Sequence, residues 1–171
     1  MQSDLACRSD EREHAHDPAG FIRTVERACQ ERGLRLTPIR ASIMRLIAQA
    51  GKPIKAYDLL QLVGEGQHFG AKAPPTVYRA LDFLIANGFV HKLASINAFV
   101  TCHHPHKGEH SFPFLICNCC HSAVELDDHE VIALLEKRAN ALGFQSQAQT
   151  LEVHGLCAAC AARETHSVES A

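Results

Sequence analysis

The sequence contains no long hydrophobic run. No apolar stretch among its 171 residues approaches the ~20 residues of a membrane-spanning helix, and tryptophan is absent altogether. The first twenty residues, MQSDLACRSDEREHAHDPAG, are polar and acidic, with no apolar segment of the kind found in a signal peptide. These absences argue against a membrane protein. We expect a cytoplasmic protein in which residues 1–19 form a polar N-terminal tail.

Cysteine is missing between residues 121 and 156, although the chain has eight cysteines in all. Six of them lie between Cys102 and Cys160, and nine of the twelve histidines lie between His91 and His166. Cytosolic thiols are kept reduced, so cysteines in such a protein more often bind metal or carry redox chemistry than form disulfides. The residues able to bind metal are therefore concentrated in the second half.

The net charge of −2 does not by itself indicate a polyanionic partner, but the charge is unevenly distributed. Residues 21–100 carry +6, residues 101–171 carry −5, and the first twenty residues carry −3. A basic block beside an acidic block is expected when only one domain contacts nucleic acid. Two ordinary solvated surfaces would give the same totals, so charge alone does not decide between these interpretations.

Proline and glycine divide the first half into helical segments with apolar residues at helical spacing. We expect helices at residues 18–32, 38–50, 56–63 and 74–87. The segments FVHKL and AFVTC follow, joined by the short polar turn ASIN, and they predict a β-hairpin. Helices followed by a hairpin is the order of a winged helix-turn-helix domain.

The second half alternates strands with a single helix. SFPFLIC and SAVEL predict two strands, DDHEVIALLEKRANALG predicts a helix, and FQSQAQTLEVHG predicts a third strand. A unit of this size needs another surface to complete its core. Because helices dominate the first half and strands with one helix make up the second, the chain as a whole is predicted to be of the α+β class.

The fourth predicted helix has features of a DNA-recognition helix. In PPTVYRALDFL, the apolar face leaves Thr76, Tyr78 and Arg79 toward the outside. Hydroxyl groups near a helix N-terminus suit phosphate contacts, and arginine suits bidentate contact with guanine. A solvated helix face would look similar, but the position of this helix before the hairpin favours the DNA-binding interpretation.

Two cysteine pairs, Cys117-x-x-Cys120 and Cys157-x-x-Cys160, predict a structural zinc site. Zinc in such a site takes four ligands in a tetrahedron, and two C-x-x-C turns supply four thiolates. The pairs need not be close in sequence if the metal ties the end of the chain to an earlier strand. Using Cys119 in place of Cys117 would make two ligands adjacent and strain the turn, so we expect Cys119 not to bind.

Several blocks together resemble the ferric uptake regulator (Fur) superfamily, and within it the zinc uptake regulator (Zur) branch. They are RLTPIR, AYDLL, PPTVYRALDFL, GFVHK, the C-x-x-C at 117–120 and HGLCAAC. The resemblance covers roughly residues 20 to 162. It implies a homodimeric, metal-dependent transcription factor with a winged-helix DNA-binding domain at 20–100, a hinge at 101–109 and a dimerisation and metal-binding domain at 110–162. Residues 163–171 would be a C-terminal tail.

The resemblance also implies functional residues and two Zn²⁺ per chain. The structural zinc would be held by Cys117, Cys120, Cys157 and Cys160. A second, regulatory zinc near the hinge would be held by His91, Cys102, His110 and Glu125. Tyr57 and Arg79 match the residues that read bases in this branch. The implied function is binding of a pseudo-palindromic double-stranded DNA operator by the zinc-loaded dimer, with repression of zinc-uptake genes.

The regulatory set is also chemically reasonable without the resemblance. One thiolate, two imidazoles and a carboxylate form a mixed set that zinc accepts, and fewer thiolates should make the metal more exchangeable. His91 belongs to the predicted wing, whereas Glu125 belongs to the second domain, so one ion would fix the angle between the domains. Taken singly, each ligand could instead be an ordinary strand residue or a buried thiol.

A histidine-rich run next to the hinge admits two interpretations. It could form an accessory zinc site, or it could be a solvated loop, which we favour slightly. The residues concerned are His103, His104 and His106.

Other functions fit the sequence less well. An iron- or peroxide-responsive regulator of the same superfamily is the main alternative, but a thiolate ligand favours zinc over Fe²⁺. A zinc-dependent nucleobase deaminase requires H-x-E and then P-C-x-x-C, and no H-x-E precedes either cysteine pair. A thiol oxidoreductase requires C-x-x-C at the start of a helix in a βαβ unit, and neither pair is expected to have that context. We therefore expect no enzyme activity and no small-molecule substrate.

Overall fold

The computed structural model describes residues 17–65, 74–103, 105, 112–126, 128–145 and 151–168. The elements of its first part are α1 (Pro18–Glu31), α2 (Pro38–Ala50), β1 (Ile54–Lys55), α3 (Ala56–Glu65), α4 (Pro74–Ala86), β2 (Val90–Leu93) and β3 (Ala98–Thr101). Those of its second part are β4 (Pro113–Cys117), β5 (Ala123–Glu125), α5 (His129–Ala141), β6 (Leu151–Gly155) and α6 (Ala158–Val168).

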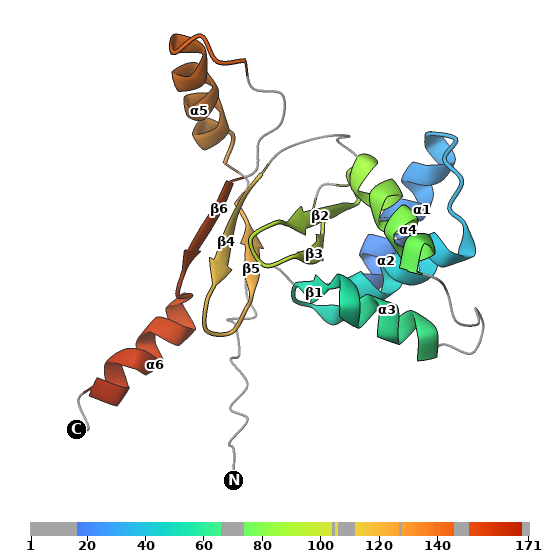
Figure 1. The fold of residues 1–171 in the computed structure, drawn as a ribbon, viewed down its shortest axis with the longest axis horizontal. Coiled ribbons are helices and arrows are strands. Elements are labelled where there is room, and N and C mark those ends of the chain that lie inside the picture. The colour runs from blue at the N-terminus through green and yellow to red at the C-terminus, as the bar shows by residue number, and fades with distance from the viewer. Residues whose placement is uncertain are drawn as a thin grey trace.

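Figure 1 shows the two parts side by side, with the β2–β3 hairpin reaching from the helices to the second sheet. The first sheet has the order β1-β3-β2 and the second has the order β5-β4-β6. Helices followed by a hairpin, and then a separate mixed sheet with its own helices, confirm the predicted α+β class and the winged-helix arrangement. We refer to the β2–β3 hairpin as the wing.

Proline and glycine mark most helix boundaries where expected, but α3 runs through Gly64, which was expected to end it, to Glu65. Proline occupies the first turn of α1 and α2, where its missing N–H has no intrahelical partner to lose. Gly51 ends α2 at φ 62°, and Gly88 follows α4 at φ 71°, a left-handed conformation that favours glycine. In the turn of the wing, Asn97 adopts φ 48°, which asparagine tolerates better than most residues.

The core of the first part packs α4 against α2. Val77, Ala80, Leu81 and Leu84 form the buried face of α4. The facing residues Ile43, Met44 and Ile47 of α2 are also buried, and Phe89 closes the core next to the wing. Burial of this face fixes the rotation of α4 and turns its other face outward.

Pairing in the second sheet explains how distant cysteines can meet. β4 pairs antiparallel with β5 and parallel with β6, and Cys117 is opposite Gly155 in the parallel register. Because β4 and β6 run in the same direction, the cysteine pairs that follow them emerge at the same end of the sheet.

The two faces of the second sheet have different surroundings. Phe114 and Ile116 form a small buried cluster with Leu93 of the wing. On the opposite face, Val124 and Val153 flank Leu115 in the register, and each of the three side chains is more than 40% exposed. We call these three residues the apolar row. α5 has no buried residue, and in Figure 1 it extends away from the sheet.

Some sequence-based expectations require correction. The two-residue strand β1 was not predicted, and neither was α6, which covers residues 158–168 and so includes part of the segment expected to be a tail. The strand expected over 144–155 is present only as Leu151–Gly155; residues 144–145 are not in a strand, and 146–150 lie outside the described residues. No helix in the described part of the chain is long and apolar enough to cross a membrane.

Candidate metal centres and DNA-facing surface

Four cysteines meet at the end of the β4–β6 pair. The sulfur atoms of Cys117, Cys120, Cys157 and Cys160 all lie within 4.8 Å of one another. Thiolates bound to one zinc at ~2.3 Å in a tetrahedron lie about 3.8 Å apart. The Cys120 Sγ to Cys157 Sγ distance is 3.8 Å. The spacing and the all-thiolate donor set therefore both fit a structural zinc ion. Cys119, by contrast, is exposed and is not part of this cluster.

Backbone N–H groups favour the thiolate form within this cluster. The N–H groups of Cys120 and Cys157 donate to the Cys117 sulfur and lower the pKa of Cys117 to about 6. The Cys157 N to Cys117 Sγ distance is 3.4 Å. On the other side, an Arg163 guanidinium nitrogen of α6 lies 3.6 Å from the Cys160 sulfur. The thiolate form is thus favoured at Cys117 and Cys120, whereas burial and the nearby sulfurs of Cys117 and Cys120 raise the pKa of Cys157.

A second group of potential ligands lies where the wing meets the second sheet. One donor atom from each of His91, Cys102 and Glu125 lies within 4.8 Å of each of the others. The His91 Nε2 to Glu125 Oε2 distance is 3.8 Å, and these side chains are only 14% and 2% exposed. We call these three residues the junction cluster.

Secondary structure holds each residue of the junction cluster in place. His91 lies in β2, with its ring 5.2 Å from that of Phe114. Cys102 directly follows β3, and its N–H donates to the Phe89 carbonyl at 3.0 Å. Glu125 ends β5, where its Oε2 accepts a hydrogen bond from the His103 N–H at 3.2 Å. The cluster thus takes two residues from the wing region and one from the second sheet.

The junction cluster fits a zinc ion in composition and approximate spacing. An imidazole, a thiolate and a carboxylate are all common zinc ligands, and ligands at ~2.0–2.2 Å in a tetrahedron lie about 3.3–3.6 Å apart. The observed 3.8 Å between His91 and Glu125 is close to that range. His110, the fourth ligand implied by the sequence, lies outside the described residues, as do His104 and His106. His103 is described and exposed, and its side chain is not part of the cluster.

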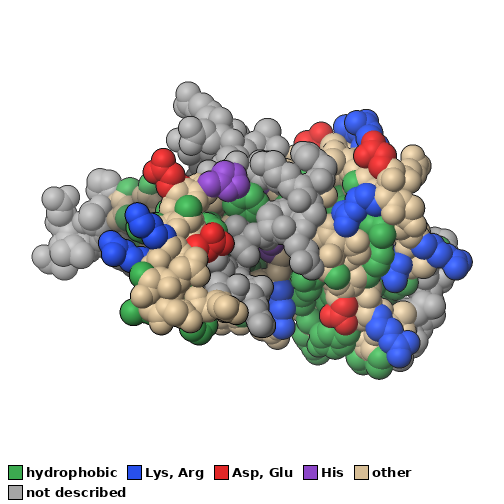
Figure 2. All heavy atoms as spheres, turned by 90° about the horizontal axis from the view of Figure 1, so that it is seen from above, with side chains coloured by type: hydrophobic (Ala, Val, Ile, Leu, Met, Phe, Trp, Pro, Cys, Tyr) green, Lys and Arg blue, Asp and Glu red, His purple; other side chains and the backbone are tan. Residues whose placement is uncertain are grey.

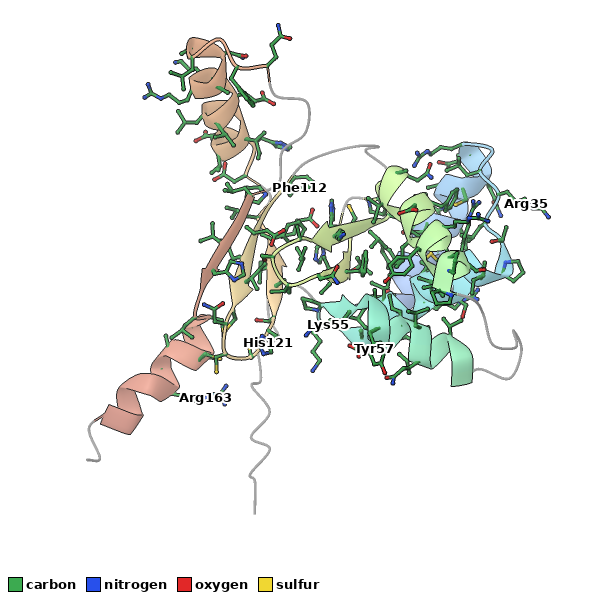
Figure 3. All side chains as sticks on the ribbon, in the orientation of Figure 1. Arg35, Lys55, Tyr57, Phe112, His121 and Arg163 are labelled. Atoms are coloured by element: carbon green, nitrogen blue, oxygen red, sulfur yellow. The ribbon has the colours of Figure 1, made fainter. Side chains whose placement is uncertain are left out.

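The residues expected to contact DNA lie on outward-facing helix surfaces. Tyr57, at the start of α3, is 67% exposed and accepts a hydrogen bond from Gln61 at 3.2 Å. Tyr78 and Arg79 are exposed on α4, and Thr76 is half-buried in its first turn. Figure 3 shows Tyr57 pointing outward on the same side as Lys55.

Figure 2 shows several Lys and Arg side chains spread over the helical part, with a few acidic ones among them. A neighbouring basic group such as Lys55 suits phosphate contacts beside the positions expected to read bases. Lys55 was not singled out from the sequence, because it lies in the unpredicted strand β1.

The sequence and the fold are both similar to those of known proteins. The profile of the ferric uptake regulator family matches residues 31–154. The zinc uptake regulation protein of Escherichia coli (strain K12) is 41% identical over 140 residues, which is 82% of this chain and 81% of that protein. A solved structure described as a zinc uptake regulator complexed with zinc and DNA is 37% identical, has a TM-score of 0.80, and is matched over 90% of this chain and 99% of its own.

The crystal structures of XcZur provide a comparison between two states. The holo form is 71% identical, with a TM-score of 0.77 over 84% of this chain and 98% of that chain. The apo form is 72% identical, but its TM-score is 0.51 over 85% of this chain and 98% of that chain. Since the identity is nearly the same, the difference in TM-score reflects structure, and the present arrangement is closer to the holo form. From the family match, the relatives and the fold, the chain belongs to the ferric uptake regulator family.

Proposed function

We propose that this protein is a zinc-responsive transcriptional regulator that binds a double-stranded DNA operator as a homodimer and represses zinc-uptake genes when zinc is abundant. The observation that carries the proposal is the junction cluster. Its donors come from both parts of the molecule, since His91 and Cys102 belong to the wing region and Glu125 belongs to the second sheet. A metal ion held by these donors would favour one relative orientation of the two parts.

The proposed zinc ligands divide into two sets with different roles. The structural set is Cys117, Cys120, Cys157 and Cys160. The regulatory set is the junction cluster together with His110. An all-thiolate site leaves no open position on zinc and suits a permanent structural ion. A single thiolate with imidazole and carboxylate ligands should release zinc more readily, which suits a sensor.

The proposed DNA-binding surface lies on α3 and α4. Tyr57 and Arg79 would read bases, and the hydroxyls of Thr76 and Tyr78 would contact phosphates. In a symmetric dimer, two such surfaces must lie about one helical turn apart, ~34 Å, to contact both halves of a pseudo-palindromic operator. The angle between the two parts of each chain controls that spacing. A metal ion that fixes this angle at the junction cluster would therefore change the DNA affinity of the dimer.

The second part offers a surface for dimerisation. The apolar row of Leu115, Val124 and Val153 is exposed, and α5 has no buried residue. Exposed apolar surface of this kind is typical of a protein–protein interface. We therefore assign residues 110–162 to the dimerisation and metal-binding domain, 20–100 to the DNA-binding domain and 101–109 to the hinge.

Metal selectivity separates this proposal from its main alternative, an iron- or peroxide-responsive regulator. The thiolate of Cys102 in the junction cluster favours zinc, whereas oxygen and nitrogen ligands alone would suit Fe²⁺ better. The identity of 41% with a zinc uptake regulation protein supports the same choice.

The test begins by selecting bound sequences from a random duplex pool with zinc-saturated protein. Fluorescence anisotropy with the selected duplex is then measured over a series of buffered free-zinc concentrations. We expect tight binding to appear only above a zinc threshold, which the His91→Ala variant should raise strongly. Fe²⁺ or Mn²⁺ should not replace zinc at equal free concentration.

Two results would contradict the proposal. DNA affinity that is the same with and without exchangeable zinc would remove the sensing role. A response to Fe²⁺ at lower concentration than to zinc would favour the iron-responsive alternative. His103→Ala serves as a matched histidine control, because the His103 side chain lies outside the junction cluster.

A further inference from the structure

A second set of contacts joins the wing to the second sheet, and these contacts require no metal. The turn of the wing, residues 94–97, lies against β6. Glu152 Oε1 accepts a hydrogen bond from the Ala94 N–H at 2.7 Å, and Oε2 accepts one from the Ser95 N–H at 3.0 Å. The Ser95 hydroxyl also donates to Oε2. One carboxylate therefore receives three hydrogen bonds from two successive residues of the turn.

His154 extends this contact toward the four-cysteine site. Its Nε2 lies 2.9 Å from the Ser95 Oγ, and its Nδ1 lies 3.1 Å from the Asn118 Oδ1. Asn118 belongs to the first cysteine turn, and its N–H donates to the Gly155 carbonyl at 2.8 Å. A continuous chain of hydrogen-bonded groups thus runs from the cysteine turn to the turn of the wing.

Apolar packing accompanies these polar contacts. Ile96, in the same turn, packs with Leu93 against Phe114 and Ile116 of β4. The two parts therefore have an interface of their own, made of a small apolar cluster with a charged hydrogen-bonding group beside it.

The charge state of Glu152 suits this role. Partial burial would raise the pKa of Glu152, but the hydrogen bonds from Ser95 and Ala94 and the nearby His154 outweigh that effect and hold the pKa below its usual range. The group is a carboxylate at neutral pH, and hydrogen bonds to an ionised acceptor are stronger than those to a neutral one.

Building on the zinc-responsive function proposed above, we propose that Glu152 is a positioning residue that holds the turn of the wing against β6 and thereby sets the zinc concentration at which the chain becomes competent to bind DNA. The contacts made by Glu152 exist only when the two parts are docked. They therefore raise the population of the docked arrangement before any regulatory metal binds. The apparent affinity of a ligand for one arrangement falls in proportion to the population of that arrangement.

The first experiment compares Glu152→Ala and Glu152→Gln with the wild type in the zinc-buffered DNA-binding assay. We expect the zinc midpoint to rise about five- to tenfold in Glu152→Ala, because charged hydrogen bonds at a partly exposed site are lost. Glu152→Gln, which keeps one acceptor oxygen, should shift the midpoint less. DNA affinity at saturating zinc should stay within about twofold of the wild type, because metal binding then restores the docked arrangement.

Glu130→Gln is the matched control. Glu130 is an exposed residue of α5 in the same part of the chain, and its loss changes the net charge equally. It should leave the zinc midpoint unchanged, which separates the contact made by Glu152 from a general effect of charge on zinc affinity.

Amide hydrogen exchange supplies a readout that does not depend on DNA binding. With the four-cysteine zinc retained and the regulatory site emptied by a weak chelator, the N–H groups of Ala94 and Ser95 should be protected in the wild type. They should lose protection in Glu152→Ala but not in Glu130→Gln. Ser95→Ala removes only the hydroxyl and should produce a smaller loss in the same direction.

An unchanged zinc midpoint in a folded, dimeric Glu152→Ala protein would overturn the inference. Much weaker DNA binding at saturating zinc would also overturn it, since Glu152 would then act in DNA binding itself. If the DNA affinity of the wild-type protein does not depend on zinc, the proposed function is wrong. Amide exchange at Ala94 and Ser95 would still show whether Glu152 holds the turn of the wing.

Discussion

The imidazole of His91 and the carboxylate of Glu125 face each other across the junction between the wing and the second sheet, 3.8 Å apart from Nε2 to Oε2. His91 lies in the sheet β1-β3-β2, whereas Glu125 lies in the sheet β5-β4-β6. The relationship therefore depends on how the two parts are docked, and any change in docking alters the distance. A metal ion bound between these two side chains would therefore favour the docked arrangement, as the proposed function requires.

Replacing Glu125 should separate metal sensing from metal-dependent folding. We expect Glu125→Ala to weaken zinc binding at the junction by more than about tenfold, since even residues that only orient a ligand have effects of 10–100-fold. The chain should still retain one tightly held zinc ion. Zinc per chain during a chelator titration, read together with DNA binding, checks this outcome. Loss of both zinc ions at once would contradict it.

Cys157 and Cys119 provide a matched pair of cysteine substitutions. Cys157→Ser removes one of the four clustered sulfurs, and we expect loss of the structural zinc and a fall in the thermal midpoint of more than about 10 °C, because metal binding contributes directly to folding. Cys119→Ser should retain full zinc content and the wild-type midpoint, since Cys119 is exposed and outside the cluster. Equal zinc loss in both variants would require a different set of ligands.

The lowered pKa of Cys117 predicts an unusual proton count for zinc binding. The backbone N–H donors of Cys120 and Cys157 bring the pKa of Cys117 down from its ordinary 9.0 to about 6. At about pH 7.5 this group is already a thiolate, so zinc binding to four cysteines should release fewer than four protons. At about pH 5.5 the number should approach four. Calorimetry in buffers of different ionisation enthalpy measures the count.

The same pKa shift makes the stability of the metal-free fold depend on pH. Because the folded pKa of Cys117 lies below the unfolded value, its stabilising contribution is fully present above about pH 9 and is lost as the pH falls through about 6. Release of four protons at about pH 7.5 would show that the backbone donors do not favour the thiolate in solution.

Arg79 and Tyr57 should affect DNA affinity without affecting zinc. Loss of a bidentate guanine contact in Arg79→Ala should weaken operator binding by about 1–3 kcal/mol and relax specificity at one base pair. Tyr57→Phe, which removes only a hydroxyl, should have a smaller effect. Arg138→Ala, at the exposed end of α5, is the control for charge. Anisotropy at saturating zinc with single-base operator variants provides the measurement; a shifted zinc midpoint in Arg79→Ala would instead indicate a structural role.

The apolar row should be required for dimerisation. Leu115→Glu places a charge between Val124 and Val153, and we expect the protein to become monomeric at micromolar concentration in sedimentation velocity, because burying an unpaired carboxylate is costly. Leu62→Glu, on the exposed side of α3, is the matched control and should remain dimeric. A dimeric Leu115→Glu protein would move the interface elsewhere.

Much of the fold was predictable because local chemistry determines it. Pro38 and Gly51 bound α2, and Gly88 separates α4 from the wing, so these boundaries can be read directly from the sequence. β1 was missed because two residues carry no periodicity. α6 was missed because it begins within the second cysteine turn and its apolar residues are mostly alanine, which bury little surface.

The sites were predictable to different degrees. The C-x-x-C spacing identified the four-cysteine cluster from the residues alone. The junction cluster required the family resemblance, because His91, Cys102 and Glu125 are far apart in the sequence and none belongs to a local motif. The contact between Glu152 and Ser95 could not be predicted, since it depends on the docking of two separately folded parts, which no short-range pattern encodes.

β4 connects the two proposed metal sites through a strand of only five residues. Phe114, near its start, is opposite Glu125, while Cys117, at its end, belongs to the four-cysteine cluster. At ~3.3 Å per residue, Phe114 and Cys117 are about 10 Å apart. The strand between them is too short for one end to lose its structure while the other end keeps it. Fraying that begins at an empty four-cysteine site would therefore reach Glu125 at once. We therefore expect the proposed structural zinc to bind before the proposed regulatory zinc, so that the regulatory site forms only in a chain whose four-cysteine site is already filled.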